Sequence, residues 1–457
     1  MPYKPPQNLW EVSEQLRYNE PLLDPNDPRY VDTSPGRTLG YERLFRSLGV
    51  DPATDTLKVK HPSQYHLFCG HRGSGKSTEL RQLKQRLNRK GLFRVIFLDV
   101  LADLDVNSLQ YPDVCLALAR GLFAELEAAK DVKLDQVFLT RLENWFNDRL
   151  LVREEFRELE AGLETGARTE GGIPFFAKLF ANITASFHVG SKVKDEVRTV
   201  FKSAYSEFAQ AFNHLIVHVE ERMAPEWEAS RLLFIIDGTD RLDQKDSVSF
   251  FIEDVHQLRQ IQGLFIYCAP IHLIYTSNVV QQGFDHVCKI PALKLHEKHD
   301  PRAGTAPVEI TATYEVLRKL ILKRAPASLF DPDPHATGDW STVDYLIRCS
   351  GGHLRDLLRL LDYAFEQATG DRFDLAAAKL AVKALSSDYR RFLQPEDLAR
   401  LVEIDTHDAE YAPNDERSRN LLFNLALLEY NDFWWQSHPV VRTLPAYQEA
   451  LRKLPLP

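Results

Sequence analysis

One segment constrains this 457-residue chain more than any other, namely residues 70–77, which read GHRGSGKS. They match the pattern GxxxxGK[ST] and lie between a short apolar run and a stretch that begins as a helix would, TEL. In such a loop the glycines let backbone N–H groups and a helix N-terminus face anionic phosphate. We predict that Lys76 neutralises the β and γ phosphates of a nucleotide and that Ser77 binds Mg²⁺. A glycine-rich turn that only links a strand to a helix would explain neither residue.

A nucleotide with Mg²⁺ also needs a carboxylate held rigidly near the phosphates. The apolar run Leu232–Ile236 ends in Asp237, which we predict to be the second metal ligand beside Ser77. Asp240 follows three residues later and is a candidate general base that would polarise an attacking water. Its alternative role is a structural cap or an ion pair with Arg241.

Short apolar runs typical of buried parallel strands recur along the chain, most of them separated by segments with helical periodicity. We expect strands at His66–Cys69, Phe93–Asp99, Leu232–Ile236, His272–Thr276 and Ala292–Leu295. This alternation predicts an α/β fold with a parallel sheet covered by helices.

The spacing of these runs suggests a domain organisation. More than 120 residues separate the second and third predicted strands, far more than one crossover needs, so a mostly helical insertion is expected there. Within it, Ile173–Val189 fits both a strand-like alternation and a helical stripe. Near the C-terminus a helix at Arg417–Leu427 precedes a hairpin, as in a winged helix. The expected parts are an N-terminal arm (1–60), a P-loop core (61–305) with the insertion at about 131–223, a helical lid (306–390) and a winged-helix-like domain (391–457).

Four segments in this order, GHRGSGKST, LLFIIDGTD, LIYTSN and SGGHLRDLLRLL, resemble motifs of the AAA+ ATPases and the related STAND signalling ATPases. The resemblance covers roughly residues 60–390 and implies ATP and Mg²⁺ as cofactors and ATP hydrolysis as the activity. It also implies that Asp237 and Asp240 are the Walker B acids, Asn278 is sensor 1 and Arg355 is sensor 2. The residues expected to bind the nucleotide are Gly70, His71, Arg72, Gly73, Ser74, Gly75, Lys76, Ser77 and Thr78. Those expected to serve catalysis are Lys76, Asp237, Asp240, Asn278 and Arg355.

The chain departs from this family pattern at one position. Many AAA+ motors have Glu directly after the Walker B Asp, whereas here the residue is Gly238. This favours a slow molecular switch over a processive motor, and it leaves open a nucleotide-binding scaffold with negligible turnover. In the arm, Tyr30, Val31 and Arg37 are candidates for contacts with adenine, or they pack the arm against the sheet.

The charge of the chain indicates which kind of partner it binds. The chain has 56 Lys and Arg against 65 Asp and Glu, a net charge of −9, so bulk electrostatics do not favour nucleic acid or anionic membranes. The segment from Arg390 to Asp432 contains ten acidic residues and five arginines. This local acidity favours a protein partner or self-assembly over DNA, although an initiator-like or loader ATPase acting on DNA stays an alternative.

The remaining sequence features are mostly negative. Five scattered cysteines without a CxxC pair predict neither a disulfide framework nor a zinc ribbon. The start lacks the apolar core of a signal peptide, and the most apolar stretch, residues 263–275, is too short to span a bilayer. We therefore expect a cytoplasmic protein with no membrane contact. His66, His71 and His353 lack the spacing of metal ligands and are expected to be ordinary polar or packed residues.

Overall fold

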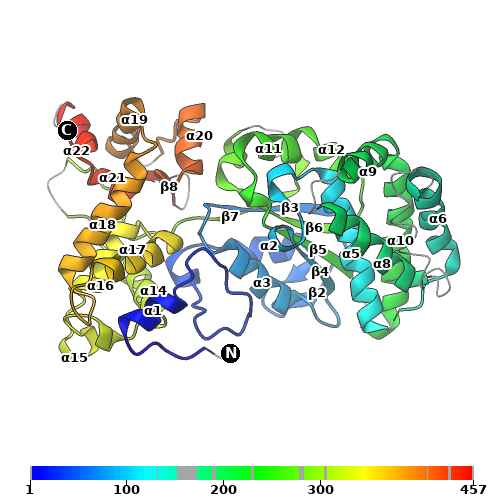
Figure 1. Cartoon of the computed structure of the whole chain (residues 1–457), viewed down its shortest axis with the longest axis horizontal. Coiled ribbons are helices and arrows are strands. Elements are labelled where there is room, and N and C mark those ends of the chain that lie inside the picture. Colours follow the sequence, from blue (N-terminus) through cyan, green and yellow to red (C-terminus); the bar gives the residue numbers. More distant parts are fainter. Residues whose placement is uncertain are drawn as a thin grey trace. The chain divides into compact units, whose positions relative to one another are not determined.

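Figure 1 shows the chain as a computed structural model. The structure describes residues 3–130, 132–151, 172–187, 192–227, 231–276, 283–302, 306–408, 410–430 and 434–454. They form two compact units. The first consists of Met1–Leu39, Gly70–Arg81 and Lys289–Pro457, and the second of Gly40–Cys69 and Gln82–Cys288.

A five-stranded parallel sheet in the order β4-β5-β6-β3-β7 forms the centre of the second unit. Its strands are β3 (Gln64–Gly70), β4 (Phe93–Asp99), β5 (Arg231–Asp237), β6 (Leu264–Pro270) and β7 (His286–Ile290). β6 is buried along its whole length, and β5 is buried except at Arg231. Burial on both faces explains the nearly continuous apolar runs of these strands. The predicted α/β fold with a parallel sheet is confirmed.

Two of the predicted strands are wrong. Residues expected to form a strand at His272–Thr276 instead form a 3₁₀ helix, Ile271–Tyr275, and the strand is the preceding run, β6. Pro270 ends β6 because proline has no N–H to donate to the sheet. Similarly, Ala292–Leu295 is not a strand, and the sheet uses β7, which precedes Pro291. The sequence of β7, HVCKI, carries a histidine and a lysine and so lacks the apolar run on which the prediction depended.

The insertion is mostly helical in its described residues. Helix α5 (Tyr111–Ala129) precedes it, and its larger helices are α6 (Gln136–Phe146), α8 (Gly172–Phe187), α9 (Lys192–Ser203) and α10 (Tyr205–Trp227) (Figure 1). The ambiguous stretch Ile173–Val189 is helix up to Phe187, and its last residues lie outside the described part of the chain. Phe176 and Phe180 of α8 stack on Phe123 of α5, with ring centroids 4.9 and 5.5 Å apart. Phe176 and Phe180 are four residues apart and lie on the same face of α8, because an α-helix has 3.6 residues per turn. Their rings therefore pack together in one core.

Shorter elements complete the second unit. They are α2 (Tyr41–Ser47), β1 (Val50–Asp51), β2 (Thr56–Leu57), α4 (Val100–Asp103), α11 (Gln244–Val248) and α12 (Val255–Leu258). Helix α3 (Lys76–Leu87) follows the glycine-rich loop. Among the described residues, no helix combines the length and the apolar character needed to cross a bilayer.

The first unit contains the helices predicted after residue 306. They are α14 (Thr311–Leu322), α15 (Pro334–Thr337), α16 (Ser341–Ser350), α17 (Leu354–Gln367) and α18 (Leu375–Arg390). Helix α16 ends at Gly351 in the left-handed conformation, and His353 caps the N-terminus of α17 through its side chain. From the arm, α1 (Leu9–Gln15) places Trp10 edge-on against Phe365 of α17, with ring centroids 5.1 Å apart.

The C-terminal segment has a winged-helix-like arrangement. It consists of α19 (Pro395–Thr406), α20 (Glu416–Phe423), the hairpin β8 (Leu427–Glu429) and β9 (Trp435–Ser437), α21 (Pro439–Arg442) and α22 (Pro445–Arg452). The helix before the hairpin ends at Phe423, four residues earlier than expected. Trp434 and Trp435 are buried, so both are core residues of this segment. Phe433 and the predicted turn before it lie outside the described residues.

Candidate nucleotide-binding site

The glycine-rich loop connects β3 to α3. Gly73 and Gly75 have φ values of +88° and +95°, which residues with side chains rarely adopt. Lys76 is the first residue of α3, and its buried ammonium group donates to the carbonyls of Gly70 at 2.9 Å and His71 at 2.7 Å. The loop therefore curls around its own lysine.

The shape of this loop fits a phosphate chain. A Cβ atom at Gly70 would lie 2.6 Å from the carbonyl oxygen of Ile290, so the close backbone packing there requires glycine. An ammonium group and the N-terminus of the 12-residue helix α3 lie in one short segment, and both attract anions. Lys76 and the loop backbone would hold the phosphates, and the Ser77 hydroxyl at the start of α3 would hold Mg²⁺.

Arg37 of the N-terminal arm supports the loop. Its side chain is buried, and Nη1 donates to the carbonyls of Ser74 at 2.7 Å and Pro291 at 3.1 Å. Its Nε donates to the Thr33 hydroxyl at 3.1 Å. Arg37 thus holds the loop through a backbone carbonyl and not through a side chain.

The rest of the arm lies on α3. The Thr78 hydroxyl accepts the amide of Leu22 at 3.2 Å, and the Tyr30 hydroxyl lies 3.5 Å from Glu79 Oε2. Burial, followed by the nearby Glu79 carboxylate, raises the pKa of Tyr30 well above its usual value, so this hydroxyl stays protonated. Val31 is buried as well. Tyr30 thus contacts α3 and Arg37 the loop, while the predicted contacts with adenine stay a prediction.

The N-terminus of α17 is hydrogen-bonded to two consecutive loop residues. The backbone amide of Arg355 donates to the Gly73 carbonyl at 3.1 Å. The ring of His353 lies with Nε2 2.7 Å from the Arg72 carbonyl, and since a carbonyl can only accept, Nε2 carries the proton. The Arg355 side chain also packs directly on Gly73. A Cβ atom added at Gly73 would lie 2.5 Å from Cβ of Arg355. The residue predicted as sensor 2 therefore contacts the glycine-rich loop.

The C-terminal hairpin also reaches the loop. The amide of Glu429 in β8 donates to Nε2 of His71 at 2.8 Å. Burial, with His353 and Lys76 close by, holds the pKa of His71 well below its usual value, so the ring is neutral and can accept this bond. Arg72 lies over the Phe423 ring at 5.6 Å. Loop, lid and hairpin are thus joined within one compact unit.

The predicted acids belong to the second unit. Asp237 is the last residue of β5, is 2% exposed, and accepts the Gly238 amide at 2.9 Å. Asp240 is buried in a 3₁₀ turn, Thr239–Arg241. Asp99 ends β4 directly opposite Asp237 in the ladder, an acid that the sequence analysis did not single out. The signal was present, because Asp99 also closes an apolar strand.

Gly238 is explained by its backbone. Its φ is +90°, and an added Cβ would lie 3.2 Å from Cγ of Leu101. A glutamate after Asp237 would be strained in this conformation. Asn278, the predicted sensor 1, lies outside the described residues, and the strand that was expected to lead into it is the 3₁₀ helix Ile271–Tyr275.

The three singled-out histidines, His66, His71 and His353, are all buried and hydrogen-bonded, as expected of packed residues. Sequence reasoning did miss one cluster, because its members are far apart along the chain. His353, Asp356 and His438 place one potential ligand atom each within 4.8 Å of one another.

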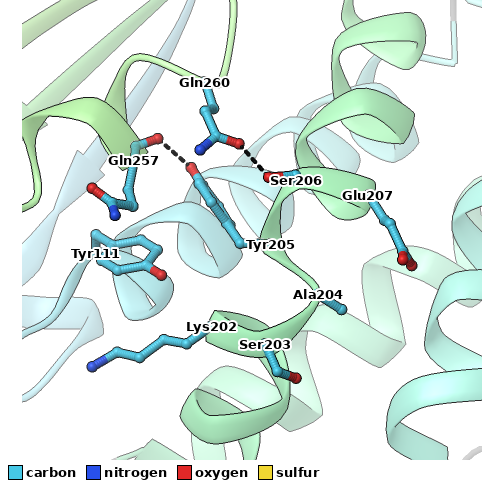
Figure 2. Close-up of a pocket in the computed structure, with 9 residues that line it drawn as sticks. All are labelled: Tyr111, Lys202, Ser203, Ala204, Tyr205, Ser206, Glu207, Gln257 and Gln260. Carbon is cyan, nitrogen blue, oxygen red and sulfur yellow. Dashed lines mark hydrogen bonds between the residues drawn. The ribbon is translucent and has the colours of Figure 1, made fainter.

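The second unit also contains a polar cavity of about 230 Å³ beside the junction of α9 and α10 (Figure 2). Across it, the Tyr205 hydroxyl donates to the Gln257 carbonyl at 2.7 Å, and the Ser206 hydroxyl donates to Gln260 Oε1 at 3.0 Å. These bonds tie the insertion to the segment before β6. None of the residues predicted from the sequence to bind a nucleotide lines this cavity.

A glycine-rich loop between a strand of a parallel sheet and the following helix defines a P-loop-type α/β fold. No family model and no curated protein matches the chain. Among solved structures, the RuvB Holliday junction branch migration motor of Thermotoga maritima aligns over 93% of this chain and 99% of its own, with 11% identity and a TM-score of 0.33. Cdc6p from Pyrobaculum aerophilum aligns over 99% of this chain and 97% of its own, with 10% identity and a TM-score of 0.33. Similarity at this level carries no argument about activity.

Proposed function

We propose that the chain is an ATP-binding and ATP-hydrolysing switch of the AAA+ and STAND type, in which the nucleotide controls the orientation of the lid and the winged-helix-like segment. One observation carries this proposal: three consecutive loop residues, His71, Arg72 and Gly73, are hydrogen-bonded to β8 and to the start of α17. A ligand that changes the loop must strain or rearrange these bonds. The output elements are therefore connected directly to the nucleotide-binding loop.

The roles of the remaining residues follow from the motifs. Lys76 and the backbone of residues 70–78 hold the phosphates, while Ser77 and Asp237 bind Mg²⁺. Because β3 and β5 are parallel strands of one sheet, their carboxyl ends lie at the same edge, which supports this pairing. Asp240 activates water, Asn278 acts as sensor 1, and Arg355 as sensor 2 responds to the phosphates from the lid.

The output is a protein partner or self-assembly, within a signalling or defence complex in the cytoplasm, as the family resemblance implies. Charge supports a protein contact over DNA. Ten acids against five arginines between Arg390 and Asp432 would repel the DNA backbone, whose neutralisation supplies most non-specific affinity.

A second candidate, a nucleotide-binding scaffold with negligible turnover, is favoured by Gly238. Its left-handed backbone leaves the position after Asp237 without a carboxylate, so hydrolysis would depend on Asp240 alone. The two candidates share the binding step and differ in turnover.

Steady-state ATPase assays and nucleotide titrations test the proposal. Lys76→Ala should abolish binding, whereas the matched change Lys84→Ala on the same helix should not. Asp240→Asn should keep binding and lose turnover by about 10²-fold or more. Tight binding without turnover in the native chain would select the scaffold, and stimulation by DNA would select the loader alternative. If the native chain bound neither ATP nor ADP, both the switch and the scaffold would be wrong.

The output is tested separately. The mass of the chain in solution should differ between ATP and ADP if self-assembly is controlled by the nucleotide. An unchanged mass would leave a separate protein partner as the output.

A further inference from the structure

Asp356, in the first turn of α17, is the centre of a buried polar cluster. Its carboxylate is fully buried and accepts the Tyr389 hydroxyl at 2.7 Å, and Nη1 of Arg359 lies 3.3 Å away. Two histidine nitrogens approach the same oxygen, His438 Nε2 at 3.1 Å and His353 Nδ1 at 3.4 Å. We call these five residues the Asp356 cluster.

Hydrogen bonds fix the protons of both histidines. Nε2 of His353 donates to the Arg72 carbonyl, and Nδ1 lies 3.4 Å from both the amide nitrogen and a carboxylate oxygen of Asp356. In His438, Nδ1 accepts the Val440 amide at 3.3 Å, which leaves the proton on Nε2, facing Asp356. Nε2 therefore carries a proton in each ring.

This arrangement does not suit a metal ion. A cation would need a lone pair on His438 Nε2, which carries a proton, and on His353 Nδ1, which already accepts an amide. The guanidinium of Arg359 would also repel it. The Asp356 carboxylate already accepts hydrogen bonds from Tyr389 and Arg359.

The charge of the cluster is stable at neutral pH. Burial by itself would raise the pKa of Asp356, but His353 and His438 outweigh it and hold this pKa well below the usual value. Burial lowers the pKa of His438. Asp356 is thus an anion that holds several donors in fixed positions, and such buried networks are rigid.

The members of the cluster come from different parts of the first unit. His353 and Asp356 belong to the start of α17, Tyr389 to α18, and His438 caps α21 in the winged-helix-like segment. The Tyr389 and His438 rings also stack, with centroids 5.0 Å apart. Through His353 the cluster ends on the carbonyl of Arg72 in the phosphate-binding loop.

We propose that Asp356 is a positioning residue that sets the His353 ring against the phosphate-binding loop and couples the shape of this loop to α18 and the winged-helix-like segment. The inference rests on the proposed nucleotide-binding function. It adds a specific route, Arg72–His353–Asp356–His438, along which loop and output segment constrain one another.

The chain offers a matched control in Asp405. This carboxylate is also fully buried, and it accepts the Tyr447 hydroxyl at 2.5 Å and the Ser437 amide at 2.8 Å, with Arg442 Nε at 3.2 Å. All these partners lie in the C-terminal segment. A change at Asp405 therefore perturbs a similar buried acid whose partners Tyr447, Ser437 and Arg442 belong to this segment.

The experiment compares Tyr389→Phe with Tyr447→Phe in the full chain. Each variant removes one hydroxyl from a buried carboxylate and keeps the ring. Both should lower the melting temperature to a similar extent. Only Tyr389→Phe should weaken binding of mant-ADP with Mg²⁺, by about tenfold, while Tyr447→Phe stays within about twofold of the native chain. Asp356→Asn and Asp405→Asn should repeat the contrast with larger effects.

The outcomes separate the two proposals. If the native chain does not bind mant-ADP, the proposed function itself is contradicted. If the native chain binds but both tyrosine variants behave alike, only the role of Asp356 is overturned. Metal analysis of the purified chain should find well under one ion per molecule. About one ion that is lost in His438→Ala would also overturn the inference, because the assigned protons would be wrong.

Discussion

The backbone amide of Arg355 donates to the carbonyl of Gly73 at 3.1 Å, and the two residues pack so closely that a Cβ at position 73 would collide with Cβ of Arg355. Gly73→Ala should therefore displace the start of α17 as well as strain the loop. We expect nucleotide affinity to fall by at least about tenfold and the free energy of unfolding to fall by about 1–3 kcal/mol. Calorimetric titration with ADP and urea denaturation measure the two effects.

Gly338→Ala is the control for this prediction. Gly338 also has a positive φ, +74°, but a Cβ there meets no atom within 4 Å. Its substitution should cost only the backbone strain and leave nucleotide affinity unchanged. Equal affinities for Gly73→Ala and Gly338→Ala would show that contact between loop and lid does not affect binding.

Arg37 should not be replaceable by lysine. Its guanidinium donates through Nη1 to Ser74 and Pro291 and through Nε to Thr33, a geometry that one ammonium group cannot reproduce. Arg37→Lys should weaken ATP binding by about tenfold, since a buried charged donor contributes on the order of 1.5–3 kcal/mol. Arg29→Lys, which changes a local pair with Asp27 in the same arm, should have little effect on the titration. Native affinity in Arg37→Lys would contradict the supporting role of the arm.

The P-loop and most of its sheet are predictable because each depends on local patterns. The bounds of β4 are those expected, Phe93–Asp99, and five of its seven residues are buried. The stretch 263–275 is different, because both sides of Pro270 are apolar and only pairing with β5 decides which half becomes the strand. β7 is partly polar and is recognised only once its neighbour β3 is known.

The site is predictable to the same extent. The loop residues follow from the motif, whereas the Asp356 cluster does not, since Asp356 and His438 are 82 positions apart and meet only through the packing of α17, α18 and α21. Arg37 is predicted to contact adenine or to pack the arm against the sheet, and in the structure it donates to the carbonyls of Ser74 and Pro291. Backbone acceptors leave no trace in a sequence. The role of Asn278 stays a prediction.

Stability should fall on mild acidification because of His66. This ring is fully buried, Nδ1 donates to the Phe265 carbonyl at 3.1 Å, and Nε2 lies 2.8 Å from the Ser47 hydroxyl. Burial lowers the pKa of His66 from 6.5 to about 4. The unfolded chain therefore binds a proton before the folded chain does, so the contribution is present above pH 6.5 and is lost as the pH falls toward 4. Its size is about 3 kcal/mol.

Urea denaturation at pH 7.5, 6.5, 5.5 and 4.5 measures this loss. His66→Asn should be less stable at pH 7.5 but should lose less stability between pH 6.5 and 4.5 than the native chain does. The difference between the pH profiles of the native chain and His66→Asn gives the contribution of His66 separately from that of the other buried histidines. Parallel pH profiles for the two proteins would mean that His66 does not remain neutral in the fold.

The insertion should depend on the buried ion pair between Asp113 and Arg198. Arg198 Nε donates to Asp113 Oδ1 at 2.9 Å, and both side chains are buried. Asp113→Asn should reduce the free energy of unfolding by about 3–5 kcal/mol, because it removes the buried counterion of Arg198 and leaves only the exposed Asp195 at 3.9 Å. Glu207→Gln is the control, since its pair with Arg149 is exposed and is expected to contribute under about 1 kcal/mol. Urea denaturation compares the two variants, and the double change Asp113→Asn with Arg198→Met should recover part of the loss. Equal costs for the buried and the exposed pair would contradict this account of how the insertion is held together.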